Sequence, residues 1–252
     1  MSGQPTPADH ALAGRAATEA GRLLVVLRAE LMGAGHHPME MGDVGDRRAH
    51  LFLLDLLTRE APGDAVLSEE GRDDLRRLDV DRVWIVDPVD GTREFSEAGR
   101  TDWAVHVALA ICGRAVAGAV ALPARDLTLT TDPAPPPRPH HDGEPRILVS
   151  RTRPPHQARI VQEAIGGRLV PMGSAGAKAM AVVLGEADVY AHAGGQYEWD
   201  NAAPAAVAAA AGLHVSRLDG SELRYNQADP WLPDLLICRP DLAEPVLRAL
   251  AV

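Results

Sequence analysis

Two aspartates at the end of an apolar run are the side chains of this sequence best suited to chemistry. Residues 84–92 read W-I-V-D-P-V-D-G-T, so a buried strand would present Asp87 at its end. Pro88 keeps the chain out of a helix, and Asp90 returns a second carboxylate to the same side. Two carboxylates this close repel each other unless a cation lies between them. The pattern therefore predicts a metal site.

The turn after Asp90 is suited to an anion. Gly91 permits a tight backbone turn, and Gly91 and Thr92 can open a short helix whose free amide groups receive a phosphate. A D-P or D-G pair alone is more typical of a turn that closes a strand. The complete D-P-V-D-G-T segment after an apolar strand favours a site for both a metal and a phosphate.

Three further acids are ordinary when each is taken alone. Glu69 follows a short apolar strand, where acidic side chains are usually solvated. Asp46 and Asp200 each stand where a helix is predicted to begin, which is typical of N-cap residues. Together with Asp87 and Asp90, these acids supply the hard oxygen ligands that magnesium prefers.

Other kinds of catalytic site find little support. The segment Gly173–Lys178 lacks the G-x-x-x-x-G-K-[ST] pattern of a nucleotide phosphate loop, and the sequence contains no G-x-S-x-G nucleophile segment. His140 and His141 stand in a Pro-rich stretch and are predicted to be solvated. Cys112 and Cys238 lack the spacing of a zinc site or a disulfide framework.

The overall charge narrows the classes of partner. The chain has 252 residues and a formal net charge of −10, which disfavours a nucleic acid polymer or an anionic membrane as its main partner. No run approaches the roughly 18 apolar residues of a membrane span. Without a signal-peptide pattern, a cytoplasmic location is expected. A small anionic substrate would need a local correction of this negative field, such as a metal site. The predicted phosphate site at Gly91 and Thr92, rather than the charge, makes a small phosphomonoester the expected partner, and a homodimer is left open.

The elements that must position the acids are a mixture of helices and strands. In the second predicted helix, we expect Leu51, Leu54 and Leu57 or Leu53 to face inward. Helices are predicted at residues 9–32, 46–59, 155–165, 175–184, 201–211 and 241–250, and strands at residues 65–67, 82–86, 103–111, 115–122, 146–150, 168–170, 187–191, 213–216 and 235–238.

The chain divides at its least regular stretch. Asp132–Pro145 is rich in Pro, His and Gly and is the clearest linker. We expect an N-terminal half, residues 1–143, with most of the metal ligands, and a C-terminal half, residues 144–252, with Asp200 and the substrate contacts. The alternation of elements predicts a layered α/β architecture of the mixed α+β kind.

The acids and their order along the chain resemble a known family. Asp46, Glu69, the D-P-V-D-G-T segment 87–92 and Trp199-Asp200 are similar to the motifs of the inositol monophosphatase superfamily, which comprises lithium-sensitive, magnesium-dependent phosphatases. The resemblance covers nearly the whole chain and implies an αβαβα sandwich with two or three magnesium ions. It implies that Glu69, Asp87 and the Val89 carbonyl hold one ion, and that Asp87, Asp90 and Asp200 hold a second.

The resemblance also implies how the residues divide the reaction. Thr92, hydrogen-bonded to Asp46, would orient the attacking water, and Glu69 would assist through its metal. The amides of Gly91 and Thr92 would stabilise charge on the phosphoryl group. No nucleophilic side chain is required.

A narrower resemblance points to one branch of the family, the CysQ-type nucleotidases. Segment 92–95 reads T-R-E-F, and Ser150-Arg151 and Gly173–Lys178 are similar to further segments of that branch. The branch implies removal of the 3′-phosphate of 3′-phosphoadenosine 5′-phosphate, and of 3′-phosphoadenylyl sulfate. The substrate contacts implied are Gly91, Thr92, Arg151, Ser174 and Lys178, with Arg151 and Lys178 at the mouth of the site, near the second phosphate.

Some features depart from these patterns. Inositol phosphatases carry an acid about seven residues before the last aspartate, whereas this sequence has His192-Ala193 there. The usual G-x-G-A segment after the predicted hairpin is missing, and Pro204 stands where the branch often has Gly. Inositol 1-phosphatase and fructose 1,6-bisphosphatase activities remain as alternatives, as does an inactive module that binds a nucleotide.

Overall fold

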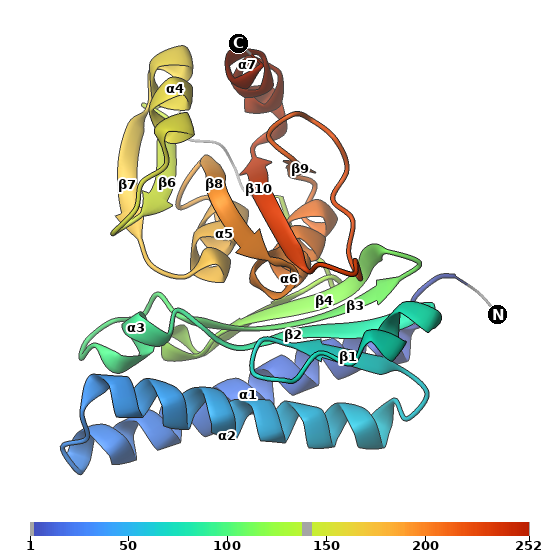
Figure 1. The fold of residues 1–252 in the computed structure, drawn as a ribbon. Helices are drawn as coiled ribbons and strands as arrows, with labels where there is room; N and C mark the ends of the chain where they lie inside the picture. The colour runs from blue at the N-terminus through green and yellow to red at the C-terminus, as the bar shows by residue number, and fades with distance from the viewer. Residues whose placement is uncertain (1–2, 138–142, 252) are drawn as a thin grey trace.

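The first half of the chain forms a helical layer and a sheet. The computed structural model describes residues 3–137 and 143–251. Two long helices, α1 (Pro7–Gly33) and α2 (Pro38–Glu60), lie side by side on one face of a five-stranded sheet (Figure 1). The strand order is β1-β2-β3-β4-β5, with only β1 and β2 parallel. The strands are β1 (Ala65–Ser68), β2 (Arg82–Asp90), β3 (Ala104–Ile111), β4 (Arg114–Leu122) and β5 (Leu127–Thr130), and the short helix α3 (Thr92–Ser96) follows β2.

The second half forms a second sheet with helices on both faces. Its strand order is β7-β6-β8-β10-β9. Helices α5 (Ala175–Val183) and α6 (Glu198–Ala210) lie between the two sheets, and α4 (His156–Ile165) and α7 (Pro240–Leu250) cover the outer face (Figure 1). The strands are β6 (Arg146–Ser150), β7 (Arg168–Met172), β8 (Val189–Tyr197), β9 (His214–Ser216) and β10 (Trp231–Cys238). The predicted αβαβα sandwich is confirmed.

Each interface between layers has its own apolar core. One core joins α1 and α2 to the first sheet, a second surrounds α5 and α6, and a third lies under α4 and α7. Because helices cover both faces of the first sheet, β3 is buried at every position rather than at alternate ones. Members of the three cores include Leu24, Leu53 and Trp84; Met180, Val207 and Ile237; and Val161, Leu236 and Val246, respectively.

The predicted start of the second helix at Asp46 is wrong. Helix α2 begins at Pro38, whose fixed backbone angle suits the first helical position, and His37 is its N-cap. Helix α1 ends at Gly33, before the His-Pro pair, and that pair only starts the next helix. Asp46 consequently lies inside α2 and does not cap it. The expected inward direction is confirmed for Leu53 and Leu57, which are buried, and is wrong for Leu51 and Leu54, which are exposed.

Other boundaries differ in the second half. Helix α6 begins at Glu198, so Asp200 occupies its third position instead of the N-cap, and the helix continues through Pro204. Strands β8 and β10 are longer than predicted, and β5 was not predicted. Within the described parts of the linker Asp132–Pro145, residues 132–137 and 143–145, there is no helix or strand. His140 and His141 lie outside the described residues.

The structure also bears on membrane insertion and on the state of the two cysteines. No helix in the described parts of the chain is long and apolar enough to cross a membrane. Cys112 is exposed, Cys238 is buried, and both are free thiols.

Candidate metal centre and active site

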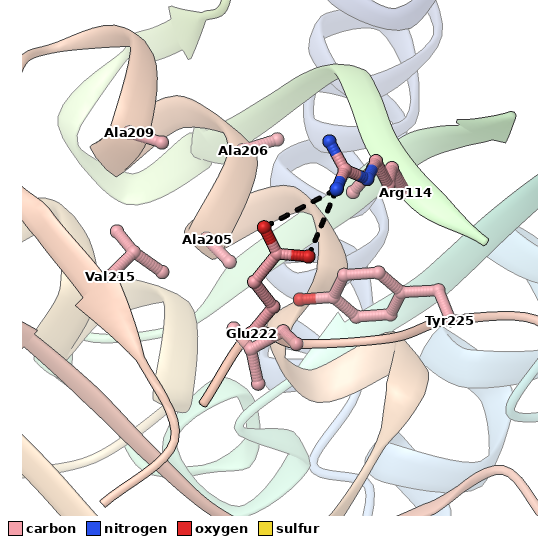
Figure 2. Close-up of a pocket in the computed structure, with 9 residues that line it drawn as sticks. Arg114, Ala205, Ala206, Ala209, Val215, Glu222 and Tyr225 are labelled. Atoms are coloured by element: carbon pink, nitrogen blue, oxygen red, sulfur yellow. Dashed lines mark hydrogen bonds and ion pairs between the residues drawn. The ribbon is translucent and has the colours of Figure 1, made fainter. Parts of the chain in front are cut away.

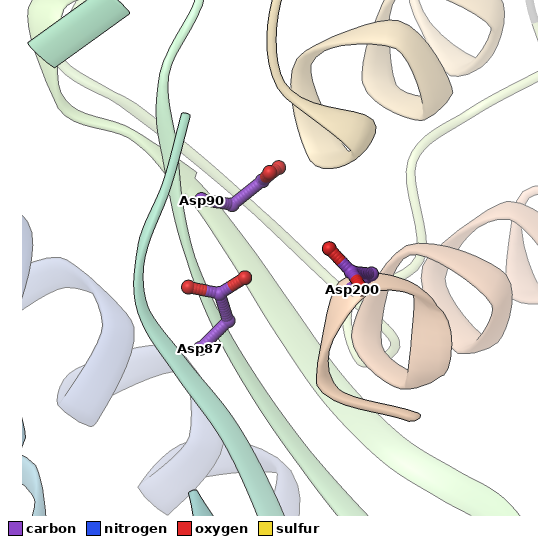
Figure 3. A group of neighbouring side chains, drawn as sticks. All are labelled: Asp87, Asp90 and Asp200. Atoms are coloured by element: carbon purple, nitrogen blue, oxygen red, sulfur yellow. The ribbon is translucent and has the colours of Figure 1, made fainter. Parts of the chain in front are cut away.

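The structure brings Asp87, Asp90 and Asp200 together at the junction of the two halves. Asp87 and Asp90 come from the end of β2, and Asp200 comes from the first turn of α6 (Figure 3). Each offers one carboxylate oxygen, and these oxygens lie within 4.8 Å of one another. A bulge in the pairing of β2 with β3 between Asp87 and Asp90 re-aims the strand end, so both side chains turn to the same region.

Asp87 is the most strongly perturbed of these acids. It is 1% exposed, and Val89 N–H donates to its Oδ1 at 3.1 Å. Burial and then the negative charges of Glu69, Asp90 and Asp200 raise its pKa well above the usual range. Without a cation, the surroundings of Asp87 therefore favour its protonated form.

Glu69 lies beside this cluster, after the end of β1. Its backbone N–H donates to the Val86 carbonyl at 3.3 Å, which fixes the chain next to β2. The Glu69 residue is exposed on one side. Burial of its carboxyl group and then the charges of Asp200 and Asp90 raise its pKa to about 7, and a hydrogen bond with Asp87 opposes this rise. Glu69 and Asp87 thus share a hydrogen bond, as the two acids predicted to hold one ion.

Asp90 is held by the N-terminus of α5. The backbone N–H groups of Ala175 and Gly176 donate to its two carboxylate oxygens at 3.1 and 2.6 Å, and Ser174 Oγ donates to Oδ2. Burial alone would raise the pKa of Asp90, but His106, Ser174 and Lys178 outweigh it and lower the pKa to about 2. Asp90 is therefore a fixed carboxylate that is ionised at neutral pH.

Asp200 is held by its own helix. Tyr197 N–H donates to its Oδ2 at 2.6 Å, as expected for an acid in the first turn. Burial, followed by the charge of Asp90, raises the pKa of Asp200 to about 6. The other carboxylate oxygen remains for a cation.

Asp46 reaches the site because glycines let α2 and α3 pack closely. A Cβ at Gly42 would lie 2.6 Å from Thr92 Cγ2, and one at Gly45 would lie 2.7 Å from the Phe95 ring. Thr92 Oγ1 consequently lies 3.5 Å from both carboxylate oxygens of Asp46 and donates to the Val89 carbonyl at 3.2 Å. The predicted contact between Thr92 and Asp46 is thus present, at the long end of the hydrogen-bond range.

The electrostatic state of Asp46 resembles that of the metal-ligand candidates. Burial, followed by the charges of Glu70 and Glu69, raises its pKa to about 8, and the hydrogen bond from Thr92 opposes this rise.

Gly91 caps α3 in the left-handed region at φ +89°, as the tight turn requires. The short helix predicted after Asp90 is confirmed, and its role in binding phosphate stays a prediction.

Among the candidate substrate contacts, the side chains of Arg151, Ser174 and Lys178 are engaged within the protein. Lys178 is 5% exposed, and its Nζ donates to the carbonyls of Gly173 and Ser174 at 3.3 and 2.5 Å. The expected place of Lys178 at the open mouth of the site is therefore wrong, because its helix face turns into the core beside Tyr190. Arg151 is half-buried and forms ion pairs with Glu94 and Glu97.

His106 is a component of the site that the sequence did not reveal. It lies on β3 directly opposite Asp87, is 1% exposed, and its Nε2 lies 3.1 Å from Asp90 Oδ2. Burial would lower its pKa, but Asp90 raises it above the usual value. A polar residue inside the otherwise apolar run A-V-H-V-A-L-A-I was the available signal, because a strand covered on both faces admits such a side chain only with a partner.

A separate hollow lies at the other end of α6. It has a volume of about 290 Å³, and Arg114 at its rim pairs with Glu222 at 3.0 Å (Figure 2). Its apolar lining includes Ala205 and Ala206. With one acid, already paired, this hollow offers no metal-ligand set, so the candidate site remains the junction of the two halves.

The acid cluster predicts how the stability of the metal-free protein depends on pH. Asp200, Glu69 and Asp46 have pKa values raised to about 6, 7 and 8, so the folded state binds protons that the unfolded state releases above about pH 4. Metal-free stability should therefore fall as the pH rises from about 5 to 8. Melting temperatures measured in a chelator across this range check the sign, and saturating Mg²⁺ should remove most of the decline. A rise in the chelator, or equal slopes in both series, would contradict the assignment.

The comparisons with known proteins agree with this arrangement. The family model described as the Inositol monophosphatase family matches residues 13–134 and 139–249. A protein of Mycobacterium bovis named 3′-phosphoadenosine 5′-phosphate phosphatase is 54% identical over 246 residues, 92% of this chain and 90% of that protein. The 3′(2′),5′-bisphosphate nucleotidase CysQ of Escherichia coli K12 is 30% identical over 79% of this chain and 84% of its own length. The crystal structure of inositol monophosphatase-II from Staphylococcus aureus superposes with a TM-score of 0.79 at 21% identity, covering 96% and 95% of the two chains.

Fold, site and comparisons define one class of protein, a phosphoric monoester hydrolase built as a five-layer sandwich. The chain belongs to the inositol monophosphatase family. The predicted resemblance to the CysQ branch is confirmed by the names of its relatives.

Proposed function

We propose that the chain is a magnesium-dependent phosphatase that removes the 3′-phosphate of 3′-phosphoadenosine 5′-phosphate. The observation that carries the metal dependence is the convergence of Asp87, Asp90 and Asp200, with one oxygen each within 4.8 Å. The donor set fits magnesium, because it consists of hard carboxylate oxygens. Asp87, Glu69 and Asp200 also have raised pKa values, and a bound cation would offset the repulsion between their charges.

The substrate proposal has separate support. The Mycobacterium bovis relative, 54% identical, is named for this substrate. Position 193, where the inositol phosphatases carry a sugar-binding acid, is alanine in this chain. Both observations favour the bisphosphorylated nucleotide over inositol 1-phosphate.

Within this proposal, each acid has a role set by its environment. Glu69, Asp87 and the Val89 carbonyl would hold one ion, and Asp87, Asp90 and Asp200 another. Bound magnesium supplies a lowered pKa for the attacking water and neutralises charge on the phosphoryl group. The amides of Gly91 and Thr92 would donate to that group.

Thr92 and Asp46 would orient the water. Thr92 Oγ1 has two lone pairs and one proton, and Asp46 lies 3.5 Å away as an acceptor for that proton. If that proton turns from the Val89 carbonyl to Asp46, the hydroxyl oxygen can accept a hydrogen bond from the water and so aim a lone pair of the water oxygen at phosphorus.

The direct test is phosphate release across a panel of substrates. The panel contains 3′-phosphoadenosine 5′-phosphate, inositol 1-phosphate and fructose 1,6-bisphosphate, each with Mg²⁺ and with a chelator. We expect the highest kcat/KM on the nucleotide and no turnover in the chelator. A control for non-specific charge effects is Asp126→Asn, which changes an exposed acid at a left-handed turn far from the cluster in sequence. A higher kcat/KM on either sugar phosphate would replace the substrate proposal, and turnover in the chelator would remove the metal.

Thr92→Ala should separate chemistry from metal binding. The substitution leaves every candidate metal ligand in place and removes the hydroxyl together with the Cγ2 methyl group, so kcat should fall by about 10²-fold while the Mg²⁺ affinity changes little. The matched variant Thr92→Ser keeps the hydroxyl and loses the methyl group that packs on Gly42. Steady-state kinetics and calorimetric Mg²⁺ titration check both. If Thr92→Ala lost kcat and Mg²⁺ affinity in parallel, Thr92 would be a structural residue of the metal site.

A further inference from the structure

The imidazole of His106 contacts two of the segments that carry candidate metal ligands. Its Nδ1 donates to the Trp199 carbonyl at 3.0 Å, and Trp199 immediately precedes Asp200. Its Nε2 lies 3.1 Å from Asp90 Oδ2, within ion-pair distance but off the direction of a hydrogen bond, so Nε2 has no hydrogen-bond partner among the described residues. Its Nδ1 also lies 4.0 Å from Asp87 Oδ2.

The ring is confined from the remaining side by α5. A Cβ at Gly176 would lie 2.0 Å from His106 Nε2, so the α5 backbone approaches the imidazole as closely as a glycine allows. The same Gly176 donates its N–H to Asp90. His106 is therefore a spacer at the point where β2, β3, α5 and α6 meet, between ligands from both halves of the chain.

We propose that His106 is a positioning residue that sets the separation of Asp90 from Asp200 and so the affinity of the site for Mg²⁺. This inference rests on the proposed metal site. Asp90 is fixed by α5 on one side and by the ring on the other, and the ring holds the Trp199 carbonyl and hence the first turn of α6. Groups that orient metal ligands in this way typically contribute 10–100-fold to metal affinity or activity.

A plain core histidine would behave differently. If His106 only filled space in the core, its substitution would lower the stability of the protein without changing the Mg²⁺ affinity of the molecules that remain folded. The two roles are distinguished by measuring Mg²⁺ binding to folded protein, independently of catalysis.

The experiment is calorimetric titration of Mg²⁺ alone into the wild type and three variants. His106→Leu removes both polar contacts, His106→Gln places an amide near the Nε2 position, and His106→Asn places one near the Nδ1 position. Val107→Ala is the control, because Val107 neighbours His106 on β3 but packs in the core under α1 and α2. We expect His106→Leu to lose about 10–100-fold in affinity, the two amide variants to lose less, and Val107→Ala to keep the wild-type value.

The outcomes are distinct for the two proposals. If the wild type does not bind Mg²⁺, the proposed metal site fails. If the wild type binds and the folded His106 variants bind with the same affinity, only the role of His106 fails. If the variants do not fold, NMR spectra of the histidine rings of the wild type are recorded during a Mg²⁺ titration. We expect the His106 resonances to shift with the same Mg²⁺ dependence as the calorimetric binding. Resonances that stay constant would overturn the proposal.

Discussion

Asp87→Asn should abolish most turnover and at the same time raise the melting temperature of the metal-free protein. Asp87 is the candidate ligand shared by both ions, so losing its charge should lower kcat by about 10²-fold or more. In the metal-free state, burial and three neighbouring acids force this carboxyl to hold a proton far above its usual pKa. A neutral amide needs no such proton, so its folded state avoids that free-energy cost.

The rise should be a few degrees, since about 1 kcal/mol corresponds to roughly 2–4 °C in a domain of this size. Melting curves in a chelator at pH 7 and at pH 4 measure it. The difference between the variant and the wild type should become small at pH 4, where about half of the Asp87 carboxyls are protonated in the unfolded state as well. A lower melting temperature at pH 7 would show that the Asp87 carboxylate is not repelled by its neighbours.

The same chemical change at Asp90 should have the opposite effect on stability. The pKa of Asp90 is lowered to about 2, so its charge stabilises the folded state above the unfolded pKa of about 4 and loses that effect as the pH falls towards 2. Asp90→Asn removes this charge. It can also place an NH₂ group, which cannot accept a hydrogen bond, opposite the Ser174 hydroxyl and the Gly176 N–H. We expect a loss of about 2 kcal/mol, or roughly 4–8 °C, together with a loss of turnover.

Asp90 and Asp87 therefore form a matched pair. Both substitutions remove one negative charge from the same cluster, and general relief of repulsion would raise the stability of both variants. Differential scanning calorimetry of the two metal-free variants side by side distinguishes the cases. If Asp90→Asn melted at or above the wild-type temperature, the contacts from the α5 N-terminus would contribute nothing to the fold.

The pair Asp87 and Asp90 could be predicted because its spacing is local, whereas Asp46, Glu69 and Asp200 are distant in sequence and were joined to it through the family resemblance. Asp87, Asp90 and Thr92 are fixed by one strand end and one turn, and the sequence contains all the information that such a turn requires. The layered fold followed in the same way from the alternation of apolar runs. Helix starts depend on residues elsewhere along the chain: Asp46 looks like an N-cap in isolation, but Pro38 begins the helix earlier and leaves Asp46 in its interior.

What could not be predicted depends on contacts between distant segments. Lys178 is a surface residue by helix pattern alone, yet a second sheet covers its face and buries it beside Tyr190. His106 becomes part of the site only when α5 and α6 reach it from the other half of the chain. Neither environment is encoded by the residues adjacent to it in sequence.

The hydrogen bonds from the N-terminus of α5 to Asp90 indicate when the metal site forms during folding. Ser174 and Asp90 are 84 positions apart, so their contact closes a long loop and forms only when the two sheets have assembled. The ion proposed at Asp87, Asp90 and Asp200 needs ligands from both halves of the chain, so an isolated half offers it no complete site and it cannot guide the early collapse. Mg²⁺ bound at this position would act on the assembled molecule: it would slow unfolding and leave the rate of folding nearly unchanged.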